Sequence, residues 1–511
     1  MTSAQVLRID YFWAALSGAL LVLSFPIVNL WPLAFFFLVP LLLCIRGKKG
    51  KDAFLLGAFA GAIAYLGLIY WVVVAVHRYG NFPLPLAIPI LLLLVLYLSL
   101  YWGAFAFLIS YVREKGEWIT LLAVPALWVG LEYLRSFLLS GFPWALVGYS
   151  QYLNTIMVQV ADVTGVYGVS FLVILCNTLL FLWIVRWRGR KRVPLQSTIF
   201  TIVLVAAACA YGFWKLHTSL TDTKGLTVGV AQGNIEQDVK WDKGFQKETL
   251  EIYGELSAKL SKTSPRLIIW PETAVPAYFP SGTGLDQKVM AIPHRLNTYL
   301  LFGSLSSRKQ GEEVKIYNSA YLISPRPRIV NRYDKMHLVP FGEYVPLSSF
   351  FPFFNSLVGI GNITPGEKAV VFKLPRGTFG TLICFEVIFP ELCRKFVRNG
   401  ADFMVTITND AWFGKTSAPY QHLAQATFRS IENRIWLVRA ANTGISAFID
   451  PWGRIKTASG LFTQEVLTGE ITLRGSKMTF YTLYGDVFAI FCSLLGICLI
   501  GYVVLRKQVV W

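Results

Sequence analysis

The chain has 511 residues, of which 55% are hydrophobic and 15% aromatic, and it carries a formal net charge of +18. Its mean hydropathy of +0.52 excludes an ordinary soluble protein and indicates a membrane protein. The basic residues adjoin apolar stretches and form no stripe along a helix, so the charge does not indicate binding to nucleic acid.

Apolar stretches long enough to cross a bilayer recur along the first 216 residues, and one more lies near the end of the chain. We expect eight membrane spans, with seven or nine as alternatives because prolines interrupt the first stretches. The expected spans are residues 12–30, 31–45, 54–76, 85–112, 119–139, 165–185, 196–215 and 484–505.

Basic clusters predict the orientation of these spans. The clusters lie at residues 46–51, 113–115, 186–192 and 506–507. With eight spans, all of them fall on the side of the N-terminus, and the positive-inside rule makes that side cytoplasmic. The apolar start is interpreted as an uncleaved signal-anchor. We therefore expect a bundle of about seven helices at 1–216, an extracytoplasmic domain at 217–480, and a last span with a cytoplasmic tail at 481–511.

The hydrophilic segment alternates β-branched runs with helical stretches, which is typical of an α/β domain. Candidate strands are residues 227–231, 267–270, 299–304, 320–324, 381–383 and 403–408. Candidate helices are residues 245–261, 390–399 and 420–434.

Three chemically different side chains stand near strand ends in this segment. Glu272 follows the apolar run 267–269, Cys384 follows the run 381–383, and Lys335 lies between them in the sequence. A carboxylate can take the proton of a thiol, the thiolate can attack a carbonyl, and an ammonium can stabilise the oxyanion. Taken singly, the same residues would be an inert buried cysteine and two surface charges.

The wider pattern gives the three residues a family context. A Pro-Glu pair contains Glu272, a second glutamate, Glu386, follows the cysteine, and the segments 409–414 (NDAWFG) and 439–444 (RAANTG) come later. With these motifs, residues 226–460 resemble the carbon–nitrogen hydrolase (nitrilase) superfamily. The resemblance implies a Glu272–Lys335–Cys384 catalytic triad and a four-layer αββα sandwich.

Motifs outside the triad connect the membrane spans to this domain. They are residues 24–26, 141–144, 148–151, 232–234, 240–241 and 340–346. With them the whole chain resembles the apolipoprotein N-acyltransferase family of the bacterial inner membrane. The resemblance implies transfer of an acyl chain from a phospholipid, typically phosphatidylethanolamine, through a Cys384 thioester to the α-amino group of the diacylglyceryl-cysteine of apolipoproteins, with ping-pong kinetics and a periplasmic catalytic domain.

The same resemblance assigns supporting roles. Glu343 would support the lysine–glutamate network, and Glu386 would order the acceptor side. Surface carboxylates are the alternative for both. Phe385 stands where the family often has tyrosine, so it could form an aromatic wall for an acyl chain but supply no hydroxyl.

Two further aromatic residues, Trp241 and Trp144, match positions at the substrate opening of the family, and Tyr344 of the 340–346 motif is a third candidate for substrate binding. An interfacial aromatic belt is the alternative for the two tryptophans. Glu132 and Arg135 share one helical face in the fifth expected span. A functional role and a structural ion pair are both open for them.

Two other function classes are weighed against acyl transfer to an amine. A membrane-anchored amidase or nitrilase-type hydrolase is the alternative, because the same three residues suit transfer to water. A transporter with an inactive appended domain is disfavoured by the intact triad. No metal-ligand spacing or phosphate loop occurs, so we expect no metal or cofactor, and we expect a monomer in which Cys384 and Cys393 are both free thiols.

Overall fold

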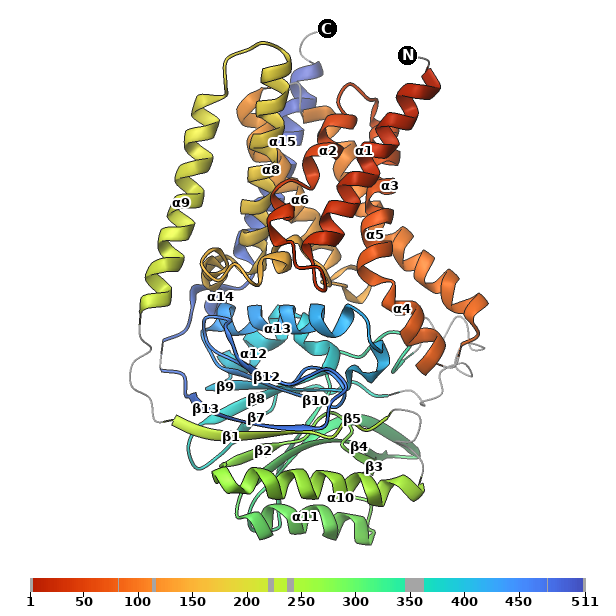
Figure 1. Ribbon diagram of the computed structural model, residues 1–511, viewed down its shortest axis with the longest axis vertical. Helices are drawn as coiled ribbons and strands as arrows, with labels where there is room; N and C mark the ends of the chain where they lie inside the picture. The colour runs from red at the N-terminus through yellow and green to blue at the C-terminus, as the bar shows by residue number, and fades with distance from the viewer. Residues whose placement is uncertain are drawn as a thin grey trace. The chain divides into compact units, whose positions relative to one another are not determined.

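The computed structural model describes residues 3–80, 82–112, 116–218, 225–236, 243–344, 363–475 and 477–508 (Figure 1). The chain forms two compact units. The first contains Met1–Val72, Ile88–Thr218 and Tyr484–Trp511, and the second contains Val73–Ala87 and Ser219–Leu483. The sequence does not predict that Val73–Ala87, which contains the end of one expected span, the start of the next and the loop between them, belongs with the α/β unit.

The first unit is helical. Its elements are α1 (Ser3–Ser24), η1 (Trp31–Phe35), α2 (Leu38–Cys44), α3 (Gly50–Ile69), α5 (Leu84–Val112), α6 (Glu117–Arg135), η3 (Leu138–Ser140), η4 (Val147–Gln151), η5 (Met157–Val160), α7 (Ala161–Thr164), α8 (Val166–Arg188), α9 (Leu195–His217) and α15 (Val487–Gln508). The short helix α4 (Trp71–Val74) crosses the boundary between the two units, and η2 (Ala75–Tyr79) lies within Val73–Ala87.

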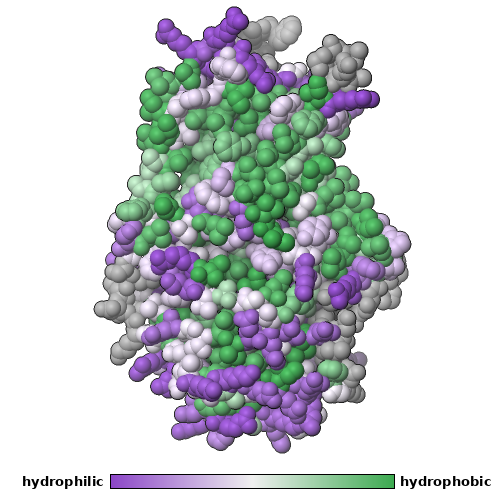
Figure 2. Space-filling model, in the orientation of Figure 1, coloured by the Kyte–Doolittle hydropathy of each residue, from purple (hydrophilic) through white to green (hydrophobic). Residues whose placement is uncertain are grey.

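Six helices in the described ranges are long and apolar enough to cross a membrane, namely α3, α5, α6, α8, α9 and α15. Their outward residues are apolar, for example Leu93 on α5 and Val203 on α9, and Figure 2 shows hydrophobic side chains over the surface of these helices. Apolar outer surfaces suit contact with lipid. The chain is therefore a multi-pass membrane protein.

The two remaining expected spans correspond to α1 and to a broken stretch. Residues 31–45 do not form one long helix, because they fold into η1 and α2. Asn29 has a left-handed backbone with φ 58°, and Pro32 lies in the first turn of η1, which suits a new helix start after a bend. The apolar stretch Trp31–Cys44 is therefore too short to cross a bilayer as one straight helix.

The charged pair of α6 binds a neighbouring turn. Arg135 donates to the carbonyl oxygens of Phe142 and Trp144 at 3.1 and 2.9 Å, and a Glu132 carboxylate oxygen accepts from the Val147 backbone N–H at 2.7 Å. Both side chains are buried. These contacts favour the structural interpretation, in which the pair fixes the turn after α6.

Two sheets form the centre of the second unit. The first has the order β13 (Glu465–Thr472), β1 (Gly225–Gln232), β2 (Leu267–Ile269), β4 (Tyr299–Gln310), β5 (Glu313–Ile323), β6 (Ile329–Asp334), with β3 (Val275–Tyr278) paired to β4. Its strands β1, β2 and β4 are parallel. The second has the order β12 (Ile455–Ala458), β11 (Ala447–Ile449), β10 (Leu437–Ala441), β9 (Phe403–Thr408), β8 (Thr378–Ile383), β7 (Val371–Lys373). Its strands β8, β9 and β10 are parallel.

Helices cover the outer face of each sheet. The helices α10 (Lys243–Leu260) and α11 (Gly284–Leu296) pack on the first sheet, and α12 (Pro390–Arg398) and α13 (Ala418–Asn433) pack on the second (Figure 1). The short elements of this unit are η6 (Ser261–Thr263), η8 (Cys384–Ile388), η9 (Asp410–Phe413) and α14 (Phe480–Tyr484), whose last residue belongs to the first unit. The expected four-layer αββα sandwich is confirmed.

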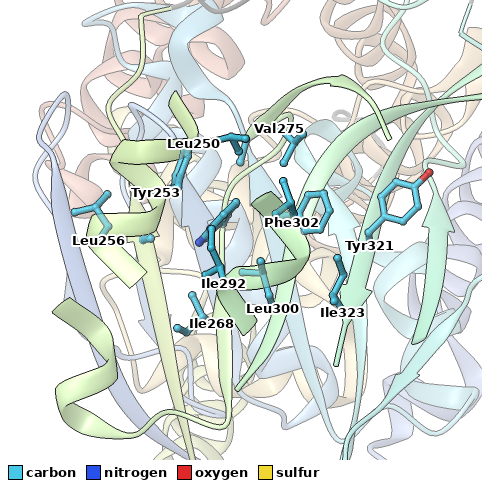
Figure 3. Close-up of a cluster of buried hydrophobic side chains, with 14 of the residues drawn as sticks. Leu250, Tyr253, Leu256, Ile268, Val275, Ile292, Leu300, Phe302, Tyr321 and Ile323 are labelled. Atoms are coloured by element: carbon cyan, nitrogen blue, oxygen red, sulfur yellow. The ribbon is translucent and has the colours of Figure 1, made fainter. Parts of the chain in front are cut away.

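An aromatic core lies between the first sheet and its two helices (Figure 3). Phe302 packs against Phe279 and Tyr321 with ring centroids 5.1 and 5.8 Å apart. Trp270, directly after β2, stacks on Tyr253 at 5.0 Å and is fully buried. Because Trp270 is anchored in this core, the chain that follows it leaves the sheet edge at a fixed place.

Candidate active site

The three predicted catalytic side chains meet in the second unit. Glu272 follows β2, Lys335 follows β6 and Cys384 follows β8, so the two sheets supply the group together. Lys335 Nζ lies 3.8 Å from Glu272 Oε1, and the charges of both act on the Cys384 thiol. The residues are 6%, 1% and 8% exposed in the order Glu272, Lys335, Cys384. The site is therefore shielded from bulk water.

Both carboxylate oxygens of Glu272 have donors. Oε1 accepts from Asn318 Nδ2 at 2.8 Å, and Oε2 accepts from the Asn409 backbone N–H at 2.9 Å. Gly303 of β4 lies so close that a Cβ there would be 2.7 Å from the Glu272 Cα and 2.5 Å from the Thr273 nitrogen. A glycine is therefore required beside Glu272, and the carboxylate is held in one orientation.

Lys335 lies between two carboxylates. Its Nζ is 2.9 Å from Glu343 Oε2, and Asn318 donates to Glu343 Oε1 at 2.9 Å as well as to Glu272. Burial disfavours the ammonium, but Glu343 and Glu272 outweigh burial and raise the pKa of Lys335 above its ordinary value. The side chain is therefore a cation throughout the physiological range. Glu343 therefore contacts both Lys335 and Asn318.

Cys384 forms a sharp turn between β8 and η8. Its φ of 54° is in the left-handed region, where a residue with a Cβ is strained. Burial raises the pKa of the thiol, Glu272 raises it further, and Lys335 opposes them. The sulfur is therefore a neutral thiol at rest. Attack on a carbonyl requires a base, and Glu272 is the carboxylate beside it.

Glu386 is enclosed by donors. Oε2 accepts from the Ile383 backbone N–H at 2.8 Å, and Oε1 accepts from the Met336 and His337 N–H groups at 2.7 and 3.0 Å and from Tyr333 Oη at 2.7 Å. The side chain has 0% exposure. It connects the turn before Cys384 to the segment after Lys335 and offers no surface to a substrate.

The predicted aromatic residues lie in different surroundings. Phe385 packs against Phe389, with ring centroids 5.3 Å apart, and Tyr344 packs beside the apolar cluster of Leu305, Leu338 and Ile363. Trp144 belongs to the first unit, where it is fully buried and packs on Trp71 with centroids 4.7 Å apart. Trp241 lies outside the described residues.

Several residues of the site escape the sequence analysis. Asn318 holds two carboxylates, and no motif marks it. Asp410, His422 and Arg439 form a fully buried cluster behind the cysteine. Asp410 and Arg439 lie within the segments 409–414 and 439–444, so those motifs are the available signal. His422 carries no such signal.

Two family models match the chain. The apolipoprotein N-acyltransferase N-terminal domain matches residues 17–179, and the carbon-nitrogen hydrolase matches residues 227–478. The apolipoprotein N-acyltransferase of Geobacter metallireducens is 45% identical over 505 residues, covering 98% of this chain and 96% of the relative. Those of Pasteurella multocida and Haemophilus influenzae are 32% identical over 512 and 501 residues, covering 98% and 96% of this chain and 96% and 94% of the relatives.

Solved structures match about half of the chain. Nit3 of Saccharomyces cerevisiae, a member of branch 10 of the nitrilase superfamily, has 19% identity and a TM-score of 0.40 and covers 50% of this chain and 93% of its own. An amidase from Nesterenkonia sp. has 19% identity and a TM-score of 0.38, with the same two coverages of 50% and 93%.

The thiol environment predicts a pH dependence. Because the pKa of Cys384 is raised, its alkylation by iodoacetamide should keep increasing with pH beyond the ordinary thiol pKa of about 8.5. Glu272→Gln removes a negative charge beside the sulfur, which lowers the thiol pKa and should shift the profile down by about 1 to 3 pH units. Peptide mass spectrometry of Cys384 measures the rate. Glu251→Gln on the exposed face of α10 is the control, and an unshifted Glu272→Gln profile contradicts the electrostatic account.

Proposed function

The chain belongs to the apolipoprotein N-acyltransferase family and is an acyltransferase, and from this premise we propose its donor, its acceptor and the side chains that act on them. Its reaction is the N-acylation of lipoproteins. The proposed donor is a phospholipid, phosphatidylethanolamine above all. The proposed acceptor is the α-amino group of an N-terminal diacylglyceryl-cysteine.

One observation carries this proposal. A neutral, shielded thiol at a strained turn lies in the field of a fixed carboxylate and a buried ammonium, which are the groups that nucleophilic acyl transfer needs. The carboxylate is Glu272, the ammonium is Lys335 and the nucleophile is Cys384. A structural ion pair would not require a cysteine held beside it in a left-handed conformation.

In the first half-reaction, Glu272 takes the proton of the Cys384 thiol while the sulfur attacks the ester carbonyl of the phospholipid. The carbonyl π electrons move to oxygen, and the Lys335 ammonium stabilises this oxyanion. The intermediate collapses, the bond from the carbonyl carbon to the glycerol oxygen breaks, and that oxygen takes the proton from Glu272. The lysophospholipid leaves, and an acyl-thioester remains on Cys384.

In the second half-reaction, the acceptor amine attacks the thioester carbonyl, and Lys335 again stabilises the oxyanion. The carbon–sulfur bond breaks, and Glu272 passes the amine proton to the leaving sulfur. An amide forms, and the enzyme returns to its starting state with ping-pong kinetics. The hydrolase alternative requires a thioester that water cleaves readily.

The contacts of Glu386 support a role different from the acceptor-side role expected of it. The carboxylate is fully buried, and its four donors come from the segments that carry Cys384 and Lys335. We therefore assign Glu386 to positioning these two groups for both half-reactions. Glu343 acts through Lys335 in the same sense.

The cellular placement is part of the proposal. We infer that the protein lies in the bacterial inner membrane as a monomer, with the second unit on the periplasmic side. The basic residues at 186–192, in the last turn of α8 and the connection to α9, support a cytoplasmic location for that connection. We retain the division into a bundle at 1–216, a catalytic domain at 217–480 and a C-terminal span at 481–511.

The nucleophile has a direct test. Incubation with phosphatidylethanolamine alone should add one acyl mass to the wild-type protein, and Cys384→Ala should abolish both this adduct and N-acylation of a diacylglyceryl-peptide. Cys393→Ala is the matched control, because Cys393 is fully buried on α12 with a pKa raised by burial to about 12. Intact-mass spectrometry measures the adduct. If the Cys384→Ala protein N-acylated the peptide at the wild-type rate, the thioester mechanism would be refuted.

The positioning role of Glu386 predicts an early block. Glu386→Ala leaves four donors without their acceptor, so thioester formation itself should fall on the order of 10²-fold through misplacement of the nucleophile. The measurement is the acyl-mass time course with phospholipid alone, and Glu312→Ala on an exposed turn is the control. An enzyme that acquires the acyl mass normally but stalls with the acceptor would return Glu386 to the acceptor side.

Orientation is tested by labelling. A cysteine at Gly284, an exposed position with open space around it, should react with a membrane-impermeant maleimide in intact spheroplasts. A cysteine at Gly189, between the basic residues after α8, should react only after the membrane is permeabilised. Labelling of the unsubstituted protein is the baseline, since Cys498 is exposed. The opposite pattern contradicts the proposed orientation.

A further inference from the structure

A buried ionic cluster lies behind the nucleophile and takes no part in the proposed reaction. Asp410 comes from η9, His422 from α13 and Arg439 from β10, and all three have no exposed surface. Figure 1 labels α13 and β10. Arg439 Nη2 is 2.5 Å from Asp410 Oδ2, and Thr408 Oγ1 donates to Asp410 Oδ1 at 2.9 Å. Burial disfavours the Asp410 charge, but the Arg439 cation and the hydrogen bond from Thr408 oppose burial, and the pKa of Asp410 lies well below its ordinary value. Asp410 is therefore ionised.

The contacts of His422 select one tautomer. Its Nε2 lies 3.2 Å from the backbone carbonyl oxygen of Cys384, which can only accept a hydrogen bond. Its Nδ1 lies 3.1 Å from Arg439 Nη2, which can only donate. Burial and Arg439 lower the pKa of His422, so the ring is neutral and carries one N–H.

A hydrogen on Nε2 satisfies both of these contacts, and Asp410 Oδ1, which then faces the bare Nδ1, keeps the hydrogen bond that Thr408 Oγ1 donates to it. A hydrogen on Nδ1 would satisfy Asp410 Oδ1, also 3.1 Å away, but would face an Arg439 N–H and leave two lone pairs opposed at Cys384. The hydrogen-bond network therefore assigns the hydrogen to Nε2. The resulting chain of donors runs from Arg439 to His422 and from His422 to the Cys384 carbonyl.

This chain ends on the peptide that carries the nucleophile. Cys384 has a φ of 54°, a conformation that persists only where surrounding contacts enforce it. Glu386 holds the residue before it through the Ile383 N–H, and His422 holds its carbonyl. In a trans peptide the N–H of Phe385 points opposite that carbonyl, and as part of the first turn of η8 it has no partner within the helix. Fixing the carbonyl therefore fixes both the sulfur and this N–H.

We propose that His422 is a positioning residue, which donates from Nε2 to the Cys384 carbonyl and holds the nucleophile peptide oriented for attack. Asp410 acts on it indirectly, because it orients the Arg439 guanidinium that selects the tautomer. This role rests on the proposed thioester reaction and adds to it a residue that touches neither substrate. The cluster supplies no proton to the reaction.

Two amide substitutions separate positioning from packing. The amide of His422→Gln can reach the place of Nε2 and donate to the Cys384 carbonyl, whereas the shorter amide of His422→Asn overlays Nδ1 and cannot. We expect His422→Asn to lower kcat for acylation on the order of 10²-fold at an unchanged KM. His422→Gln should recover most of that loss. His294→Asn is the control, because His294 also sets a ring nitrogen 3.0 Å from a backbone carbonyl but lies exposed on α11.

The assay uses two acyl donors, so that failure of the proposed function can be distinguished from failure of the His422 proposal. One donor is phosphatidylethanolamine in detergent micelles, and the other is p-nitrophenyl butyrate, whose nitrophenolate burst reports thioester formation without a phospholipid. If the wild-type protein gave a nitrophenolate burst but was not acylated by phosphatidylethanolamine, the proposed phospholipid donor would be refuted. The comparison of the His422 variants would still hold with p-nitrophenyl butyrate. Equal kcat for wild type and a folded His422→Asn would overturn the positioning role, and so would equal losses in a folded His422→Gln and His422→Asn.

A measurement on the unmodified protein covers the case in which the variants fail to fold. Nitrogen NMR of ¹⁵N-histidine-labelled protein, with His294→Asn used to assign signals, should show a buried ring with Nε2 protonated and Nδ1 bare. A buried ring protonated on Nδ1 has no hydrogen for the Cys384 carbonyl and overturns the proposal.

Discussion

The buried ammonium of Lys335 is the constraint on which the active site depends. An unpaired charge at 1% exposure would cost several kcal/mol, so the fold must surround it with acceptors. Glu343 and Glu272 supply them, and Asn318 bridges both carboxylates. The same arrangement holds the base beside the thiol. The stability of the fold and the acyl-transfer chemistry therefore require the same contacts. A substitution that breaks these contacts should lower both the stability and the activity.

The four-layer architecture explains how these contacts are assembled from distant parts of the chain. Glu272 and Lys335 come from the first sheet, and Cys384 comes from the second, so the packed faces of the two sheets set the distance between base and nucleophile. Trp270 fixes the exit of Glu272 from the aromatic core. Glu386 then joins the two sheets through donors from both, as a carboxylate with no exposed surface.

The sequence predicts the membrane class and the α/β domain, because hydropathy and strand periodicity are local signals. The grouping of Glu272, Lys335 and Cys384 into a triad comes from the family resemblance and not from their spacing. The sequence does not predict the break within residues 31–45, which depends on a left-handed Asn29, or the membership of Val73–Ala87 in the second unit. The sequence also does not predict the contacts of Glu386 and His422. Their partners are distant in sequence. A glutamate or a histidine in the sequence gives no sign of whether its side chain faces solvent or a ring of backbone donors.

The pairing of β13 with β1 has a consequence for biosynthesis. The first strand of the domain is covered on its outer edge by the last, along the full length Gly225–Gln232. Until the ribosome has made β13, that edge presents unpaired backbone groups to other chains. Because β13 ends at Thr472, the catalytic fold is completed only after nearly the whole domain has been made, with α14 and the final apolar helix α15 still to follow.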